Sequence, residues 1–224
     1  MMPRSLLLGL LLALVPAGAL AQDEIADIDY EHLALRGIGF DFGTVWPDRV
    51  LETQAFRLRF DLGYAGPGLR IVPSVSYWSS RLADGEIATL EQRVSTLVAN
   101  QTGGAPPALD LGVIDYTDIA LGIDGHVVWE LPLDLLTYGG LGVAAHFVDA
   151  DGDAIADTFI EDLFDGVEVG FNVHLGTEYP ITEVLRIYGS GRYEIMSDLQ
   201  LVQARVGLQF MIGPNAPGEG RGSN

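Results

Sequence analysis

The chain has 224 residues, a length that suits a single domain. It contains no cysteine, which excludes a disulfide-stabilised scaffold and a lipid-anchored bacterial lipoprotein. Its net charge of −19 opposes association with nucleic acid and with anionic membrane surfaces, so we expect no nucleic-acid partner.

Residues 1–21 are typical of a secretory signal peptide. Arg4 precedes an apolar run over residues 6–15, and Ala19-Leu20-Ala21 has the small-x-small pattern of a cleavage site. We predict a signal peptide at 1–21, followed by a short acidic lead-in at 22–33. The alternative, an N-terminal membrane helix, is disfavoured because the apolar run is too short to span a bilayer comfortably.

Eight later segments alternate apolar and polar residues, which predicts β-strands with one apolar face. They are residues 34–43, 54–64, 69–80, 119–131, 135–148, 166–179, 184–196 and 199–212. In the sixth, Val167, Val169 and Phe171 share one face and Glu168 lies on the other. Pro73 marks a weak point in the third because it has no N–H to donate. The fourth pattern continues backward to Leu109, so that strand is expected to extend.

Between the third and fourth strands, apolar residues recur every three or four positions over residues 84–100. This spacing predicts a short amphipathic helix with Asp84 as its N-cap, ended by Gly103-Gly104. We expect the helix to pack over the mouth of a barrel. A partner-binding helix is the alternative interpretation.

Eight amphipathic strands must close into a barrel, since an open apolar edge would aggregate. A soluble lipocalin-like carrier would turn the apolar face inward, whereas a membrane barrel turns it outward. The polar face favours the membrane barrel because it carries both signs of charge, which can pair inside a narrow lumen. The predicted luminal network comprises Arg57, Arg59, Arg70, Asp61, Asp124, Glu130, Glu168, Glu178, Arg186, Arg192, Glu194 and Arg205.

Two further features favour a membrane barrel. Aromatic residues of the apolar face lie near strand ends, as interfacial girdles require, for example Tyr77, Phe147 and Tyr179. Short and long connections also alternate along most of the chain. With an even number of strands, this places the short turns and both termini on one side.

The pattern over residues 34–212 resembles the small eight-stranded outer-membrane β-barrel proteins of the OmpA, OmpX and OmpW type. Residues 205–212, RVGLQFMI, look like the signal at the last strand that the barrel assembly machinery reads, with Arg205, Gly207, Phe210 and Ile212 at its key positions. In the family this signal usually ends the chain, and here a Gly- and Pro-rich tail, 213–224, follows, which we expect to be disordered.

The resemblance implies a monomeric all-β transmembrane barrel in the outer membrane of a Gram-negative cell, reached by export through the periplasm. Its expected partners are outer-membrane lipid, lipopolysaccharide and the assembly machinery. The function we favour is structural, adhesive or surface-interacting, with a polar plugged lumen. The alternative is a narrow passive pore for small or hydrophobic solutes. A lipid A-modifying enzyme is disfavoured because no serine–histidine pair has useful spacing, so no catalytic residue is assigned.

Two groups of residues have the composition of a metal site. Asp149, Asp151, Asp153 and Asp157 resemble the D-x-D-G-D-G-x-x-D calcium loop, with Ala154 in place of its second glycine. We hypothesise calcium there, against a solvated acidic loop, and expect no other cofactor. The second possibility is a metal held by the histidines of three consecutive strands, His126, His146 and His174. It is disfavoured because His146 should lie well above the other two, so luminal hydrogen bonds are the expected role.

Overall fold

The computed structural model describes residues 33–156, 158 and 166–212. The predicted signal peptide, nearly all of the acidic lead-in and the tail therefore lie outside the described residues. Within them the chain forms nine β-strands and one helix. These are β1 (Gly37–Pro47), β2 (Thr53–Asp61), β3 (Tyr64–Gly66), β4 (Leu69–Arg81), α2 (Asp84–Thr102), β5 (Asp115–Leu131), β6 (Leu135–Asp151), β7 (Gly166–Thr182), β8 (Leu185–Ile195) and β9 (Gln200–Met211).

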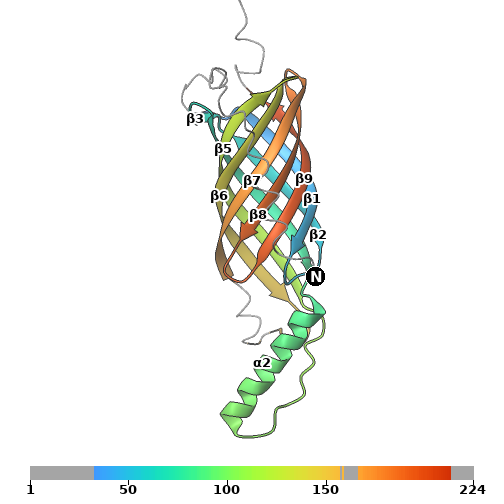
Figure 1. Ribbon diagram of the computed structural model, residues 1–224. Helices are drawn as coiled ribbons and strands as arrows, with labels where there is room; N and C mark the ends of the chain where they lie inside the picture. The colour runs from blue at the N-terminus through green and yellow to red at the C-terminus, as the bar shows by residue number, and fades with distance from the viewer. Residues whose placement is uncertain (1–32, 157, 159–165, 213–224) are drawn as a thin grey trace, which may run out of the picture.

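All the strand pairs are antiparallel, and the sheet closes on itself. Neighbouring strands follow the order β2-β1-β9-β8-β7-β6-β5-β4-β3, and β2 also pairs with β4. The three-residue β3 pairs with β4, on the same edge of β4 that β2 pairs with farther along the strand. The result is the predicted eight-stranded up-and-down barrel (Figure 1).

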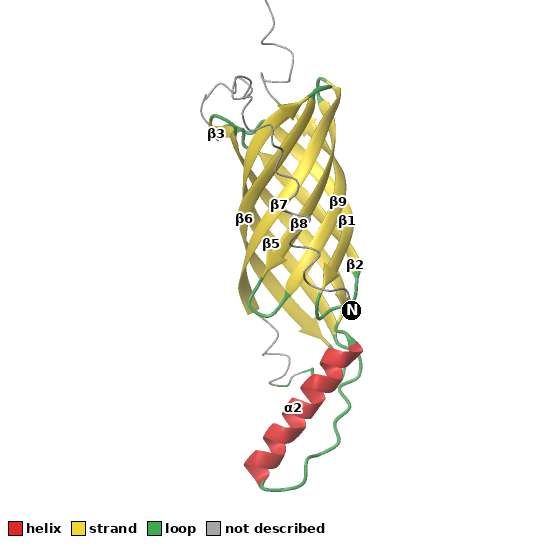
Figure 2. Cartoon of the chain, in the orientation of Figure 1, coloured by secondary structure: helices red, strands yellow, loops and turns green. Residues whose placement is uncertain are grey.

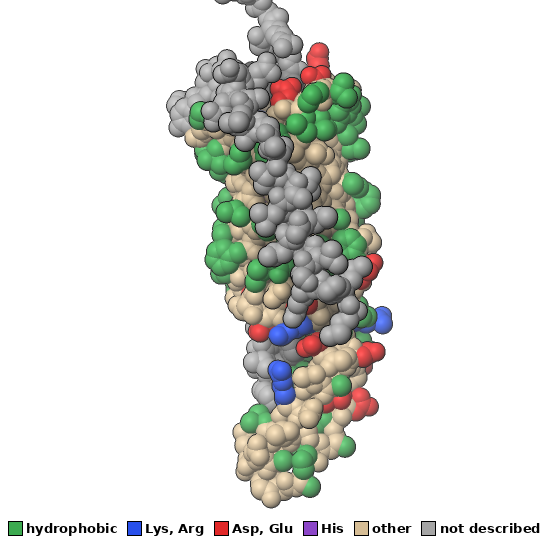
Figure 3. Space-filling view, in the orientation of Figure 1, with side chains coloured by type: hydrophobic (Ala, Val, Ile, Leu, Met, Phe, Trp, Pro, Cys, Tyr) green, Lys and Arg blue, Asp and Glu red, His purple; other side chains and the backbone are tan. Residues whose placement is uncertain are grey.

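Burial alternates along the strands in the sense of a membrane barrel. In β7, the outward Phe171 is 63% exposed, whereas the inward Asn172 is 5% exposed. Figure 3 shows hydrophobic side chains spread over the barrel wall, with most charged side chains of this face toward the ends. A soluble carrier needs the opposite arrangement. The outward face is therefore built for lipid, and the lipocalin-like alternative was wrong.

The two ends of the barrel differ, and we name them by their connections. The turn end carries the short β2–β4, β5–β6 and β7–β8 connections, and the helix end carries α2. β5, β6 and β7 each have 17 residues, and at the helix end they extend beyond the neighbouring strands. Among the described residues, positions 166–170 of β7 pair with β6 but have no partner on the β8 side.

The helix α2 ends at Thr102 with Gly103 as its C-cap, as predicted, but it differs from the prediction in two respects. Its N-cap is Ala83 rather than Asp84, without a capping side chain. It leads away from the barrel instead of covering the mouth (Figure 2), and none of its residues is fully buried. The chain returns alongside it, because Ser95 Oγ donates to the Pro107 oxygen at 2.6 Å and Leu111 N to Glu91 Oε1 at 2.9 Å. We call residues 83–114 the arm.

Two expectations about strand continuity had different outcomes. β5 does not extend back to Leu109, since Gly112 has a φ of 63°, a left-handed conformation that interrupts a strand. Pro73 keeps its place in the ladder with β5, but the ladder between β2 and β4 stops at Ser74. In the described part of the chain, no helix is long and apolar enough to cross a membrane.

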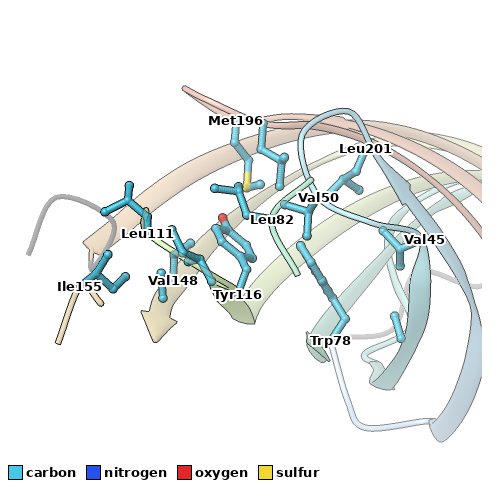
Figure 4. Close-up of a cluster of buried hydrophobic side chains, with 14 residues drawn as sticks. Val45, Val50, Trp78, Leu82, Leu111, Tyr116, Val148, Ile155, Met196 and Leu201 are labelled. Atoms are coloured by element: carbon cyan, nitrogen blue, oxygen red, sulfur yellow. The ribbon is translucent and has the colours of Figure 1, made fainter. Parts of the chain in front are cut away.

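The helix end of the barrel is filled by apolar side chains, which we call the apolar cluster. Its members are Val45, Val50, Ala55, Trp78, Leu82, Leu111, Ile114, Tyr116, Val148, Ala150, Ile155, Met196, Leu199 and Leu201. Figure 4 shows Met196 pointing toward Leu82, with Tyr116 and Trp78 beside it. Ile87, Leu90 and Val94 of α2 pack against this cluster and attach the base of the arm.

Candidate functional site in the barrel lumen

The lumen between the turn end and the apolar cluster is occupied by charged side chains from seven of the eight strands and by polar side chains of β6. Because inward residues alternate with lipid-facing ones, each strand delivers one such group about every two residues. The groups form three layers along the barrel axis. From the turn end they are centred on Glu178, on Asp41 with Asp124, and on His146.

The first layer gathers three arginines around a single carboxylate. Glu178 is completely buried, and Arg70 binds it with two nitrogens, Nη2 at 2.6 Å from Oε1 and Nη1 at 3.0 Å from Oε2. Arg59 Nη2 lies 2.8 Å from Oε1, and Arg186 Nη1 lies 3.3 Å from Oε2. Charge-assisted bonds of this kind are shorter and stronger than neutral ones. Glu178 therefore joins β7, β2, β4 and β8 across the lumen.

Neutral partners complete this layer. Gln209 Nε2 lies 3.0 Å from Asp61 Oδ2, and Gln209 Oε1 accepts from Arg59. The Arg59 guanidinium lies 3.4 Å from the centre of the Tyr188 ring, in the range of a cation–π contact. Asp61 Oδ1 also accepts from the Gly63 backbone N–H at 2.9 Å.

The second layer is built on two aspartates. Asp41 Oδ2 accepts from Arg57 Nε at 2.9 Å and from the Tyr188 hydroxyl at 2.7 Å. Its Oδ1 accepts from Arg205 Nη1 at 3.4 Å. Asp124 accepts from Arg192 and, at 3.4 Å, from Asn172 Nδ2. Arg57 links the two aspartates, because its Nη1 lies 4.0 Å from Asp124 Oδ2.

The third layer adjoins the apolar cluster. His146 Nδ1 lies 3.0 Å from Asp118 Oδ2, and its Nε2 lies 3.4 Å from Glu194 Oε1. Gln203 Nε2 donates to the other oxygen of Glu194 at 3.4 Å. His146 is thus separate from His126 and His174, as the sequence indicated.

Inward glycines make room for these large side chains. A Cβ at Gly176 would lie 2.5 Å from Tyr138 Cζ, and one at Gly170 would lie 2.6 Å from His146 Nε2. Separations under 3.0 Å cannot be tolerated without movement. The glycines of the polar face therefore shape the lumen to its charged contents.

The structure places most of the predicted luminal network together. Nine of its residues are buried in the lumen: Arg57, Arg59, Arg70, Asp61, Asp124, Glu178, Arg186, Glu194 and Arg205. Arg192 is partly buried beside Asp124. Glu168 is also partly buried, and no hydrogen bond joins its Oε2 to a described residue. Glu130 was wrongly included in the predicted network, because it lies exposed near the end of β5, one residue before the strand ends.

The predicted luminal network lacks several members of the layers, although the strand pattern had placed Asp41 on the polar face. Asp41 is central to the second layer, and its parity in β1 marks it as inward. Asp118 was missed because the predicted strand began at residue 119, whereas β5 begins at Asp115. The apolar cluster was missed altogether. Its signal is a pair of adjacent apolar residues at the helix end of a strand, as in Tyr77-Trp78 or Phe147-Val148, where both faces become apolar.

One group in the described part of the chain has the composition of a metal site. Potential ligand atoms of Asp124, His126 and His174 all lie within 4.8 Å of one another. Arginines already hold two of the three. Arg70 Nη2 lies 3.0 Å from His126 Nδ1, and Arg192 binds Asp124. Because these guanidinium charges would repel a cation, we assign the group a structural role.

The first two aspartates of the hypothesised calcium loop lie on an extended strand. Asp149 and Asp151 belong to β6 and are exposed on its outward face, whereas a calcium loop brings its oxygens together in a tight turn. Asp153 follows in a turn, and Asp157 lies outside the described residues. Calcium binding therefore stays a prediction.

The residues resembling an assembly signal lie along β9 and just beyond it. Arg205 points into the lumen and Phe210 is exposed on the outward face. Gly207 is inward, where a Cβ would lie 2.7 Å from Tyr188 Cζ, and Ile212 follows the strand end. Recognition by assembly machinery stays a prediction.

Two cavities lie among the luminal side chains, and each measures about 10 Å³. One lies between the first two layers, beside Arg59, His174 and Ser190. The other lies beside Ser74, Gln203 and Arg205. A cavity of this size holds about one water molecule.

Comparison with known proteins identifies the fold but no family. No family model and no curated protein matches the chain. Among solved structures, Neisserial surface protein A (NspA) is similar with a TM-score of 0.55 and 10% identity, over 81% of this chain and all of that one. Ail, the attachment invasion locus protein of Yersinia pestis, has a TM-score of 0.47 and 12% identity, over 81% of this chain and 99% of its own. The N-terminal β-barrel domain of Pseudomonas aeruginosa OprF has a TM-score of 0.40 and 12% identity, over 80% of this chain and 98% of its own. At such identities the likeness to NspA shows the fold alone, an eight-stranded transmembrane β-barrel.

Proposed function

We propose that the chain is an integral outer-membrane barrel that acts at the cell surface in a structural, adhesive or surface-interacting role. The observation that carries this proposal is the content of the barrel. Three layers of buried polar side chains and the apolar cluster follow one another along the axis. The cavities beside the layers have room for about one water each. Such a lumen is plugged, so the protein acts through the surfaces outside its lumen.

The helix end then faces the exterior and the turn end the periplasm. This orientation follows the general rule that the short turns of outer-membrane barrels are periplasmic and the longer loops external. It presents the arm and the edge of β7 at residues 166–170, which β8 does not cover, to the surroundings of the cell. The outward apolar face contacts membrane lipid and lipopolysaccharide.

Planar-bilayer recording tests the plugged lumen. The refolded barrel should give no stable unitary currents, because the charged layers and the apolar cluster fill the lumen along its axis. A matched control is Arg93→Ala on the exposed face of the arm, which should be equally silent. Stable unitary currents from the parent chain would contradict the proposal and favour the narrow pore.

An epitope inserted between Gly103 and Gly104 tests the orientation. These residues form the tip of the arm, where the helix ends in a left-handed glycine cap and an insertion disturbs no strand. Antibody should label intact cells that carry this insertion. The same epitope inserted at Glu183, in the β7–β8 turn, should be detected only after the outer membrane is permeabilised. The reverse pattern would place the arm in the periplasm and remove the surface role.

A further inference from the structure

The turn between β5 and β6 has an unusual backbone. Leu133 and Asp134 have φ values of 73° and 58°, and in the described part of the chain they are the non-glycine residues with positive φ. Elsewhere this conformation falls on glycine, at Gly63, Gly68, Gly103 and Gly112. A leucine there is strained, because its Cβ crowds the following carbonyl oxygen.

Packing against the described residues does little to offset this strain. Leu133 is 86% exposed, more than any other large hydrophobic residue described. Glycine would relieve the backbone, and a polar residue would suit water. An exposed leucine in a left-handed turn is explained if its side chain contacts an apolar environment outside the chain.

The turn is continuous with the lipid-facing surface. Leu133 lies between Leu131 and Leu135, the last and first residues of two strands whose outward faces are apolar, and it shares their parity. At the same end of the barrel, Ile181 near the end of β7 and Val184 in the β7–β8 turn are exposed. Figure 3 shows hydrophobic side chains gathered at that end.

We propose that Leu133 is a membrane anchor, whose side chain inserts into the acyl-chain boundary of the leaflet at the turn end. The partner is phospholipid, because the anchor prolongs an apolar surface that already faces lipid. Asp134 and the exposed Glu130 beside it then lie at the level of the head groups. The proposal rests on the membrane-barrel fold and does not depend on the surface role or the plugged lumen.

A chain without cysteine allows a direct test by single-site labelling. Leu133→Cys is labelled with an environment-sensitive fluorophore, and the protein is refolded into phosphatidylcholine vesicles. Its emission should be quenched by nitroxide-labelled lipid and protected from aqueous iodide. Ile123→Cys, in the middle of the lipid-facing band, provides the membrane reference. Ser197→Cys, in the exposed β8–β9 turn, provides the aqueous one. Iodide quenching equal to that at Ser197 would overturn the proposal.

A second measurement is the change in urea midpoint caused by Leu133→Asn. We expect its sign to differ according to whether Leu133 lies in lipid or in water. Asparagine adopts the left-handed region more readily than leucine does, so Leu133→Asn relieves strain while removing the apolar contact. If Leu133 anchors in lipid, the variant should unfold from vesicles at a lower urea concentration than the parent. Asp134→Asn is the matched control and should change the midpoint little. A raised midpoint for Leu133→Asn would mean that the side chain faces water, and would refute the anchor.

Discussion

The charged layers and the apolar cluster use the same inward positions of the barrel but hold it together differently. Toward the turn end these positions carry arginines and carboxylates in paired geometry. Toward the helix end they carry Val45, Trp78 and Val148. The strand pattern alone does not separate the two regions. The difference lies in what each region must join.

The ion pairs join strands to strands. Every charged member of the three layers lies on a β-strand, where the closed sheet fixes the direction of its side chain. Half of the apolar cluster comes instead from connections: Val50, Leu82, Leu111, Ile114, Ile155, Met196 and Leu199. Charge-assisted hydrogen bonds need such fixed directions, whereas apolar burial is non-directional and tolerates loops. The barrel therefore uses ion pairs within its wall and apolar contacts to fasten its loops.

Removing Glu178 should have the largest effect. Glu178→Ala leaves Arg59, Arg70 and Arg186 facing one another without their shared carboxylate, and breaking a buried pair in this way costs about 3–5 kcal/mol. The loss should appear as a lower urea midpoint for the barrel refolded in vesicles, followed by its heat-modifiable gel mobility. Glu130→Ala removes an exposed glutamate and should change stability by no more than about 0.5 kcal/mol. Equal midpoints for the two variants would show that the first layer does not stabilise the wall.

Ile114→Ala should act on the loops rather than on the wall. Ile114 is buried in the apolar cluster at the base of the arm, and truncating such a residue costs about 2–4 kcal/mol. Because the arm is joined to the barrel mainly through this cluster, the cost should appear as local opening. Trypsin should cut at Arg93 faster, while the urea midpoint of the barrel falls little.

The neighbouring Val113 is exposed and supplies the matched control. Val113→Ala should leave the rate of cleavage at Arg93 unchanged. If Ile114→Ala lowered the global midpoint as strongly as Glu178→Ala, the two regions would not be separable.

Gly176→Ala should disturb the first layer by crowding. The added Cβ would meet Tyr138 Cζ at 2.5 Å and the Gly189 backbone oxygen at 2.6 Å. Overpacking of this kind costs about 1–3 kcal/mol, measured as a lower urea midpoint. At Gly125 the nearest atom, the Leu141 oxygen, is 3.8 Å away, so Gly125→Ala should be close to neutral. Unchanged stability in Gly176→Ala would mean that the lumen is looser than these distances indicate.

The strands and their inward faces were predictable because side-chain alternation is a local property. The alternation of Val167, Glu168 and Val169 assigns both faces of β7 without knowledge of its neighbours. It also identified Glu178 and its arginines as inward. The alternation did not show that the three arginines meet at the one carboxylate of Glu178. Their meeting depends on the register between β7, β2, β4 and β8.

The connections were harder to predict because their contacts join distant parts of the chain. Leu111 fits the parity of β5, yet Gly112 interrupts the strand and Leu111 turns into the apolar cluster. Asp84 has the residue type of an N-cap, but the Ala83 backbone N–H donates to the Arg49 oxygen at 3.0 Å and the helix begins there. Both outcomes depend on where the strand ends lie, which local sequence does not specify.

The uncapped helix gives the smallest prediction. Ala83 has the extended backbone of an N-cap residue but no side chain that can accept from the first helical N–H groups. Ala83→Ser supplies such an acceptor and should stabilise α2 by about 1 kcal/mol. Because the arm lies outside the wall, trypsin should cut at Arg93 more slowly while the urea midpoint stays unchanged. Ala88→Ser, exposed inside the helix, supplies no cap and should give no protection. A higher midpoint in Ala83→Ser would mean that arm and wall unfold together, and the apolar cluster would then be part of the same cooperative unit as the charged layers.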